Sequence, residues 1–162
     1  MSINRYKPYI IVLPEDRANE EITNGFIQAP NVNNRAIKVE RPAKGWSKVV
    51  EKFTTQLVPE MRQFTDSFVV LLMDFDQRED RLTLVTSQIP EDLKDRVFVL
   101  GVLSEPENLK RNINKTFEEI GDSLAKDCPD SKNELWRHDL LRHNETELDR
   151  IIPSVQPFLF VA

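Results

Sequence analysis

Two aspartates, Asp74 and Asp76, stand two positions apart at the end of the apolar run of residues 68–73. An unbroken apolar run rich in valine and leucine is typical of a strand buried on both faces of a parallel sheet. Residues two apart on a strand point to the same side, so we expect both carboxylates to project together at its carboxyl end, where α/β proteins bind ligands. Because like charges held together repel each other unless a cation or a proton lies between them, the pair indicates a divalent metal site.

Acidic residues follow two other apolar runs in the same way. Glu15 comes after residues 9–13, and Glu105 and Glu107 come after residues 97–103. We therefore expect acids from three strands to converge on one rim of a sheet. Mg²⁺, or Mn²⁺ in its place, takes carboxylate oxygens together with water and substrate phosphate, which suits it to phosphoryl chemistry. The candidate metal ligands are Asp74, Asp76, Glu15 and Glu105.

The same acids also have a purely structural explanation. Asp-x-Asp pairs are common on protein surfaces. Glu105 and Glu107 fall in the first turn of the helix that is expected next, where the helix dipole favours carboxylates. Asp16 is expected to cap the helix that follows Glu15.

The apolar patterns predict strands and helices in alternation. Strands are expected at residues 9–13, 35–41, 68–73 and 97–103, and the second is placed nearer the sheet edge because its apolar and charged residues alternate. The order predicts an α/β fold, with a mostly parallel sheet of about four strands flanked by helices and a helical C-terminal tail.

Helical periodicity fills the connections between these strands. One helix follows Asp16, and a second runs over residues 46–64, where Pro59 is expected to kink or split it. A short helical pattern surrounds residues 91–95, and one long amphipathic helix is expected over residues 109–124, ended by residues 128–130.

Length and composition indicate one soluble domain. The chain has 162 residues, of which 40% are hydrophobic and 30% charged. We expect a core at residues 8–127 and a helical C-terminal extension at residues 128–162. The net charge of −5 provides no overall basic field for nucleic acid.

The single cysteine and the absence of long apolar runs bear on location. Cys128 cannot form an internal disulfide, which is typical of the reducing cytoplasm, and we interpret it as a passive residue. No run is long enough to span a bilayer, and the N-terminus lacks the apolar stretch of a signal peptide. A cytoplasmic protein without membrane contact is expected.

A glutamate after the first apolar strand and an Asp-x-Asp after a later one, here Glu15 with Asp74 and Asp76, resemble the Toprim domain of topoisomerases, bacterial primases and OLD-family nucleases. The resemblance covers roughly residues 8–105. It implies a Rossmann-like α/β fold in which the three acids bind Mg²⁺ and Glu15 acts as a general acid or base on nucleic-acid phosphodiesters. The family usually has glycine directly after the glutamate, where this chain has Asp16.

Other families fit less well. The sequence Asp74-Phe75-Asp76 is similar to the nucleophile motif of haloacid-dehalogenase-like phosphatases, but that motif usually opens the chain and has threonine or valine where Arg78 stands here. A glycosyltransferase with an Asp-x-Asp motif would normally need a larger domain. No glycine-rich phosphate loop is present, which argues against a P-loop or Rossmann nucleotide site.

Basic residues are candidates for phosphate contacts. His138 and His143 are five residues apart, about 140° around a helix, so they are poor joint metal ligands. The alternative for all of these residues is an ordinary solvated or packed helix face. The candidates are Lys44, Lys48, Arg137, His138, Arg142 and His143.

The sequence therefore predicts a small Toprim-like α/β domain that binds Mg²⁺ and acts on nucleic-acid phosphodiesters, as a nuclease or nuclease subunit. Because it lacks an obvious surface for gripping DNA, a partner protein or a homodimer is expected. The alternative is a non-catalytic protein-interaction module that keeps the fold and uses its acidic rim or helical tail for binding.

Overall fold

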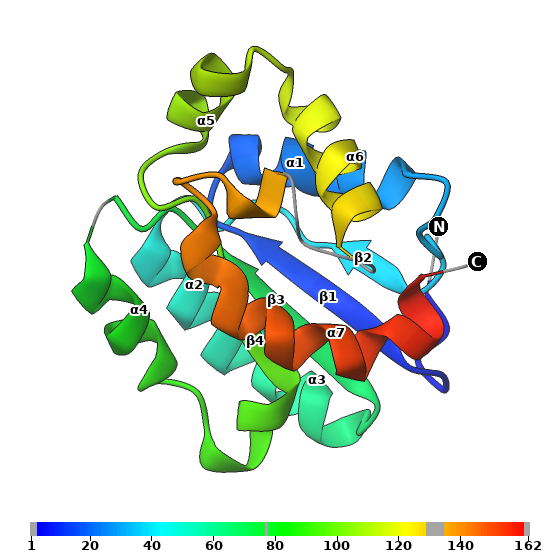
Figure 1. Ribbon diagram of the computed structural model, residues 1–162. Helices are drawn as coiled ribbons and strands as arrows, with labels where there is room; N and C mark the ends of the chain where they lie inside the picture. Colours follow the sequence, from blue (N-terminus) through cyan, green and yellow to red (C-terminus); the bar gives the residue numbers. More distant parts are fainter. Residues whose placement is uncertain (1–2, 77, 129–134, 161–162) are drawn as a thin grey trace.

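Four parallel strands form one sheet in the computed structural model, which describes residues 3–76, 78–128 and 135–160. The strand order is β2-β1-β3-β4, so the predicted α/β fold is confirmed and the second strand lies at an edge (Figure 1). Because β1, β3 and β4 are neighbours and parallel, their carboxyl ends adjoin on one rim. The strands are β1 (Tyr9–Pro14), β2 (Ile37–Val39), β3 (Ser67–Leu72) and β4 (Val97–Leu100).

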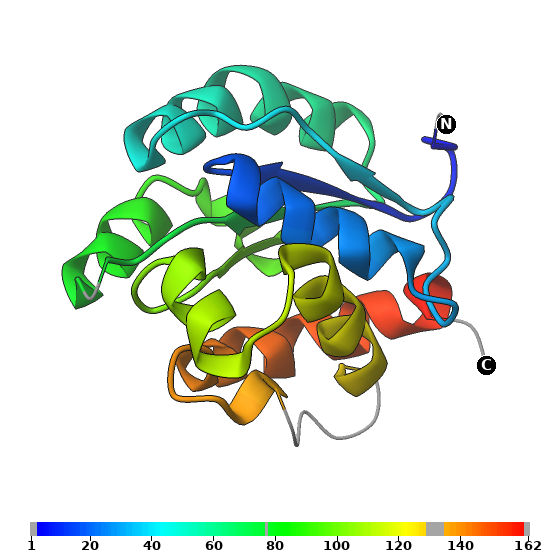
Figure 2. The ribbon, with the colours of Figure 1, turned by 90° about the horizontal axis from the view of Figure 1, so that it is seen from above.

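Helices cover both faces of the sheet. On one side lie α1 (Arg17–Gln28), α6 (Phe117–Asp127) and α7 (Glu145–Leu159), and on the other lie α2 (Trp46–Lys52) and α3 (Val58–Gln63) (Figure 2). The strand sequences explain this arrangement, because alternate residues enter two different apolar clusters. In β1, Ile10 and Val12 face α1, α6 and α7, whereas Tyr9, Ile11 and Leu13 face α2 and α3. A strand covered on both faces has to be apolar at every position.

The third and fourth strands end earlier than expected, at Leu72 and Leu100, yet their backbones stay paired beyond these ends. The Met73 N–H donates to the Leu100 carbonyl over 3.0 Å, and the Phe75 N–H donates to the Val102 carbonyl over 3.1 Å. Gly101 makes this approach possible, because a Cβ atom there would lie 1.7 Å from the Met73 carbonyl oxygen. The paired backbone extends the rim outward and carries Asp74 with it.

The helical segment after Trp46 is divided near Pro59, as expected. A π-helical turn, Phe53–Leu57, joins α2 to α3, and the Val58 N–H donates to the carbonyl of Phe53, five residues earlier. Pro59 occupies the first turn of α3, directly after this π-helical turn.

Two shorter elements follow β3. The helical pattern near residues 91–95 is a 3₁₀ helix, Glu91–Arg96. A further helix, α4 (Glu79–Thr86), occupies a polar stretch that the sequence had not marked as helical. It matters for the site because it contributes Arg81.

The prediction of a single long helix over residues 109–124 is wrong, since the structure has two helices there. The first, α5 (Pro106–Ile113), ends at Asn114 in a left-handed conformation with φ of 54°. The second, α6, begins at a capping box in which Thr116 and Glu119 each accept a hydrogen bond from the other's backbone N–H. Cys128 follows its last residue, while residues 129 and 130 lie outside the described part of the chain.

Replacing Thr116 with alanine removes the acceptor for the Glu119 N–H and is expected to lower the free energy of unfolding by about 1 kcal/mol. Urea unfolding followed by circular dichroism measures the change. Thr55→Ala, which makes the same substitution at an exposed helical position, is the control. An equal loss in both variants would show that the capping box does not stabilise α6.

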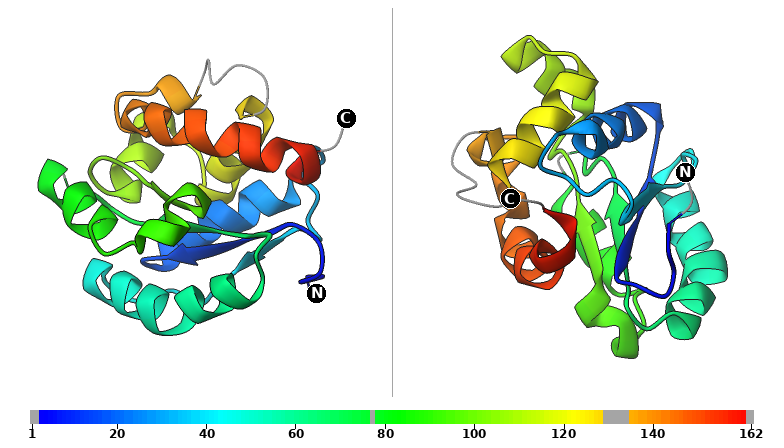
Figure 3. Two further views of the ribbon diagram at one scale, coloured as in Figure 1. Left: turned by 90° about the horizontal axis from the view of Figure 1, so that it is seen from below. Right: turned by 90° about the vertical axis from the view of Figure 1, so that its right-hand side faces the viewer.

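The C-terminal part packs on the sheet. The short 3₁₀ turns Leu135–Arg137 and Arg142–Asn144 lead into α7, whose apolar residues join the cluster that contains Ile10 and Phe98. Figure 3 shows α7 and α3 on opposite sides of the sheet. In the described part of the chain, no helix combines the length and the apolar character that crossing a bilayer requires.

Candidate functional site

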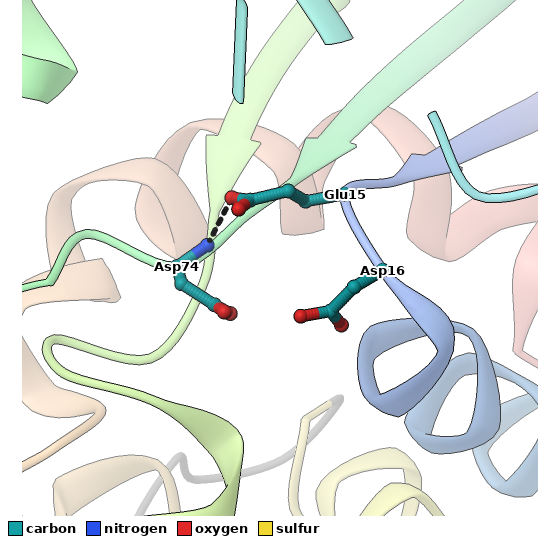
Figure 4. Close-up of side chains that lie close together, drawn as sticks. All are labelled: Glu15, Asp16 and Asp74. Carbon is teal, nitrogen blue, oxygen red and sulfur yellow. Dashed lines mark hydrogen bonds between the residues drawn. The ribbon is translucent and has the colours of Figure 1, made fainter. Parts of the chain in front are cut away.

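Three carboxylates meet at the carboxyl edge of the sheet. Glu15 directly follows β1, Asp16 precedes the first residue of α1, and Asp74 lies two residues beyond β3. Each offers one oxygen, and these oxygens all lie within 4.8 Å of one another. We refer to Glu15, Asp16 and Asp74 as the acidic cluster. Figure 4 shows the Asp16 and Asp74 side chains pointing toward one another.

Backbone hydrogen bonds between β1 and β3 set the spacing of Glu15 and Asp74. The Glu15 N–H donates to the Leu72 carbonyl over 2.8 Å, which continues the pairing of the two strands. The Asp74 N–H then donates to Oε1 of Glu15 over 2.9 Å (Figure 4). The main chain of one strand end therefore orients the side chain of the other.

Helix α1 positions the third carboxylate. Asp16 is its N-cap residue and accepts a hydrogen bond from the Asn19 N–H over 3.1 Å, so the predicted cap is confirmed. The buried Asn19 side chain donates through Nδ2 to Oδ1 of Asp74 over 3.1 Å. The first turn of α1 thus holds both aspartates, and Asp16 faces Asp74 while it caps the helix.

The cluster carries more negative charge than its surroundings favour. Burial, reinforced by the charges of Asp16 and Glu15, raises the pKa of Asp74 to about 8. Burial also raises the pKa of Glu15, against the hydrogen bond from the Asp74 N–H, which lowers it. The cluster is therefore stabilised by a bound proton or a bound cation.

A buried arginine lies beside the cluster. Arg81 of α4 donates through one guanidinium nitrogen to the backbone carbonyl of Asp74 over 2.7 Å, and its charge lowers the pKa of Glu15. Its guanidinium stands over the Trp46 ring, 5.4 Å from the centroid. Among the described residues, neither Nε of Arg81 nor Oδ1 of Asn19 has a hydrogen-bond partner, although both atoms are buried.

Two predicted ligands, Asp76 and Glu105, lie outside the acidic cluster as the described residues define it. Asp76 is exposed and has a left-handed backbone with φ of 51°, so its side chain leaves the alternation that would have placed it beside Asp74. Its charge still raises the pKa of Glu15. Glu105 is exposed at the start of α5, and Glu107 lies in the first turn of that helix, as the helix-dipole explanation expects.

Of the predicted phosphate contacts, Lys44 comes near the cluster through its backbone. The Lys44 N–H donates to the Glu15 carbonyl over 2.7 Å, in a turn where Lys44 has φ of 69°. Its side chain is exposed. Lys48, also exposed, forms an ion pair with Glu51 at 3.4 Å. Lys44 is therefore the lysine that lies beside the acidic cluster.

The other four candidates lie between α6 and α7. Arg137 is exposed, and Arg142 pairs with Asp139 at 3.1 Å. Nδ1 of His138 accepts a hydrogen bond from the Leu140 N–H over 3.1 Å. No interaction among the described residues joins these four residues to Lys44 in a single patch.

His143 is not exposed for phosphate binding. Its ring packs edge-on against Phe75 with centroids 5.1 Å apart, and no hydrogen bond of ordinary geometry from the described residues reaches either ring nitrogen. Burial lowers the pKa of His143, and the nearby backbone of Gly101 offsets part of this effect. A neutral imidazole in an apolar contact fits the packed alternative better than a phosphate contact.

Sequence reasoning missed three contributors to the site. From the sequence, Asp16 is assigned to capping alone, and neither Asn19 nor Arg81 is included. The sequence does indicate the first two, because Asp16 adjoins Glu15 and Asn19 lies one helical turn after Asp16. It does not indicate Arg81, since nothing local shows that α4 folds back over the rim.

The donor set suits a hard divalent cation. Carboxylate oxygens on opposite sides of an ion are about 4.2 Å apart for Mg²⁺ and up to roughly 5.2 Å apart for Ca²⁺. A cluster whose oxygens lie within 4.8 Å of one another is thus compatible with a metal ion but does not identify it. The chain matches no protein-family model, and comparisons with curated proteins and with solved structures gave no match. The Toprim resemblance therefore stays a prediction that rests on the acids and the element order.

Proposed function

We propose that the chain binds Mg²⁺ or Mn²⁺ at the acidic cluster and uses it to hydrolyse or transfer nucleic-acid phosphodiesters, as a nuclease or nuclease subunit. The observation that carries this proposal is the meeting of three carboxylate oxygens, all within 4.8 Å of one another, at the carboxyl edge of a parallel sheet. The raised pKa values of Asp74 and Glu15 support it, because a cation would relieve the repulsion that causes part of each shift.

The residues have separate roles in this proposal. Asp16 and Asp74 are metal ligands, held at a fixed separation by the first turn of α1. Glu15 is a further ligand or the general base, and its raised pKa makes it a stronger base than an ordinary glutamate. A bound divalent ion would supply water activation and neutralise charge at the scissile phosphate. Arg81 holds the Asp74 backbone in place through the hydrogen bond to its carbonyl.

Nucleic acid would be held with the help of a second protein or a second copy of the chain. The net charge is −5, and the basic candidates do not converge on the cluster. Phosphate contacts supply much of the affinity of nucleic-acid binding proteins, so a partner that contributes basic residues would complete the site.

The metal proposal is tested by calorimetric titration of Mg²⁺ and Mn²⁺ into the metal-free protein. We expect binding by the wild type, and a loss of at least tenfold in affinity in Asp74→Asn and in Asp16→Asn, because each removes a charged ligand. Glu105→Gln, which neutralises an acid outside the cluster, is the matched control and should bind as the wild type does. Equal affinity in all four proteins would contradict the proposal.

The catalytic part is tested by incubating the protein with single-stranded and double-stranded DNA and RNA, with Mg²⁺ or Mn²⁺ and with chelator. Cleavage that requires the metal and is lost in Glu15→Gln is expected. A protein that binds metal yet cuts none of the four substrates would not be a nuclease by itself.

A second candidate is a non-catalytic protein-interaction module with the same fold. The negative net charge and the dispersed basic residues favour it. If neither metal binding nor cleavage is found, this second candidate replaces the first.

A further inference from the structure

An apolar cavity, partly open to its surroundings, lies between the sheet and the helices α1, α6 and α7. Its volume is about 100 Å³, and none of its surface comes from a polar atom of the described residues. Ile10 and Val70 line it from the sheet, Ile22 from α1, Leu124 from α6, and Ile151 and Val155 from α7. Protein interiors are close-packed, so a space of this size in so small a domain is unusual.

The polar groups in the cavity wall are satisfied within the protein. The Thr23 hydroxyl donates to the Asn19 carbonyl over 2.9 Å, and the Trp136 indole N–H donates to the Leu124 carbonyl over 3.0 Å. A water molecule needs two to four polar partners to be held in such a site, and the described wall residues offer no polar surface. The wall therefore favours an apolar molecule over water.

The helices around the cavity cannot simply move inward to fill it. At one end of α7, Oε2 of Glu147 accepts a hydrogen bond from the Val99 N–H of β4 over 2.8 Å. At the other end, the Asn33 N–H donates to the Leu159 carbonyl over 2.7 Å. Helix α7 is thus fastened at both ends, at a set distance from the sheet.

Helices α1 and α6 are fixed by a different contact. They touch backbone to backbone, since a Cβ atom on Gly121 would lie 1.9 Å from the Ile22 carbonyl oxygen. This pair cannot approach any closer. The polar anchors on α7 hold it at a set distance from the sheet, and the contact between α1 and α6 keeps these two helices from closing together.

We propose that this cavity is a binding site for a small, uncharged, apolar molecule of about the size of a benzene ring or a short alkyl chain. A dry cavity of about 150 Å³ lined by leucine, isoleucine and phenylalanine binds benzene and xenon, and this cavity has a similar lining. The ligand gains dispersion contacts that the empty wall lacks. A charged or strongly polar molecule is disfavoured because the described wall residues present no polar surface to pair with it.

Benzene and benzoate are the probes for a thermal unfolding test on the full chain without metal. Benzene at several times its dissociation constant is expected to raise the unfolding temperature by about 2–4 °C, and benzoate is expected to have no effect. Val155→Phe places a ring in the cavity and should abolish the benzene effect. Gln156→Phe adds the same ring at the exposed neighbouring position and should keep it.

A second measurement does not depend on how the variants fold. In wild-type protein with labelled methyl groups, benzene should shift the NMR signals of Val70 and Ile151, which line the cavity. The signals of Val69 and Val99, which face the opposite side of the sheet, should stay in place. No benzene effect in the wild type, or equal effects on both faces, would overturn the proposal. Neither result would bear on the acidic cluster, because no metal is involved.

Discussion

Replacing Gly121 with valine is expected to destabilise the protein by on the order of 3–5 kcal/mol, a large share of the 5–15 kcal/mol that stabilises a typical domain. A Cβ atom at this position would lie 1.9 Å from the Ile22 carbonyl oxygen and 2.6 Å from the Phe26 backbone nitrogen. Both neighbours are main-chain atoms of α1, so no side chain can rotate away, and the two helices would have to separate.

Gly25 is a second glycine at the α1–α6 contact, and replacing it with valine is expected to destabilise the protein in the same way. A Cβ atom on Gly25 would lie 2.0 Å from the carbonyl oxygen of Glu118 in α6. Urea unfolding should therefore give a large loss for Gly121→Val and for Gly25→Val. Lys126→Val, which introduces valine at an exposed position of α6, is the control and should change stability by well under 1 kcal/mol. A small effect at Gly121 would mean that the helices are not in direct contact.

Asp74→Asn is expected to stabilise the metal-free protein at pH 8 and to flatten the pH dependence of its stability. The pKa of Asp74 is about 8 in the folded state and roughly 3.9 in an unfolded chain. At a pH between these two values, the folded state thus holds a proton that the unfolded state has released. The stability that this proton represents is complete below about pH 4 and is lost as the pH rises through 8.

The raised pKa of Glu15 acts in the same direction, whereas the lowered pKa of His143 acts in the opposite one. Stability linked to His143 is present above about pH 6.5 and is lost below it. We therefore place the measurement between pH 6.5 and 8.5, where Asp74 dominates. The wild type should lose on the order of 1–2 kcal/mol across this window, seen as a fall of a few degrees in unfolding temperature.

Asp76→Asn is the matched control, because it removes the same charge from an exposed position two residues away. It should keep most of the slope that Asp74→Asn removes. Saturating Mg²⁺ should also flatten the wild-type profile if the cluster binds the ion. Equal slopes in the wild type and in Asp74→Asn would show that Asp74 is not buried against the other carboxylates.

The fold could be predicted from the sequence because the sequence patterns that indicate it most strongly are local. The uninterrupted apolar runs that contain Ile11 and Val70 require cover on both faces, and their alternation with helical periods leaves few topologies other than a parallel sheet. The division of the helix predicted over residues 109–124 was missed although its signal was present. Thr116 and Glu119 form a capping box by sequence, and the continuing apolar period concealed it.

Only part of the site could be predicted from the sequence, for a physical reason. Placing Asp76 beside Asp74 assumes that the strand alternation continues, and one left-handed residue at position 76 ends it. Adding Asp16 requires the path of the turn between β1 and α1, which depends on where β3 lies. Side-chain geometry at a strand end is set by neighbours distant in the sequence, and one sequence does not reveal them.

The position of α7 also has a consequence for folding during synthesis. All four strands have left the ribosome's catalytic centre once Leu100 is joined, but the helices α6 and α7, which cover one face of the sheet, are made afterwards. For a time on the order of seconds, the nascent chain therefore presents Val70 and Phe98 on an uncovered apolar surface. Chaperones that recognise apolar segments should bind chains that stop before Glu145, and should release chains that include all of α7 once these have left the ribosome.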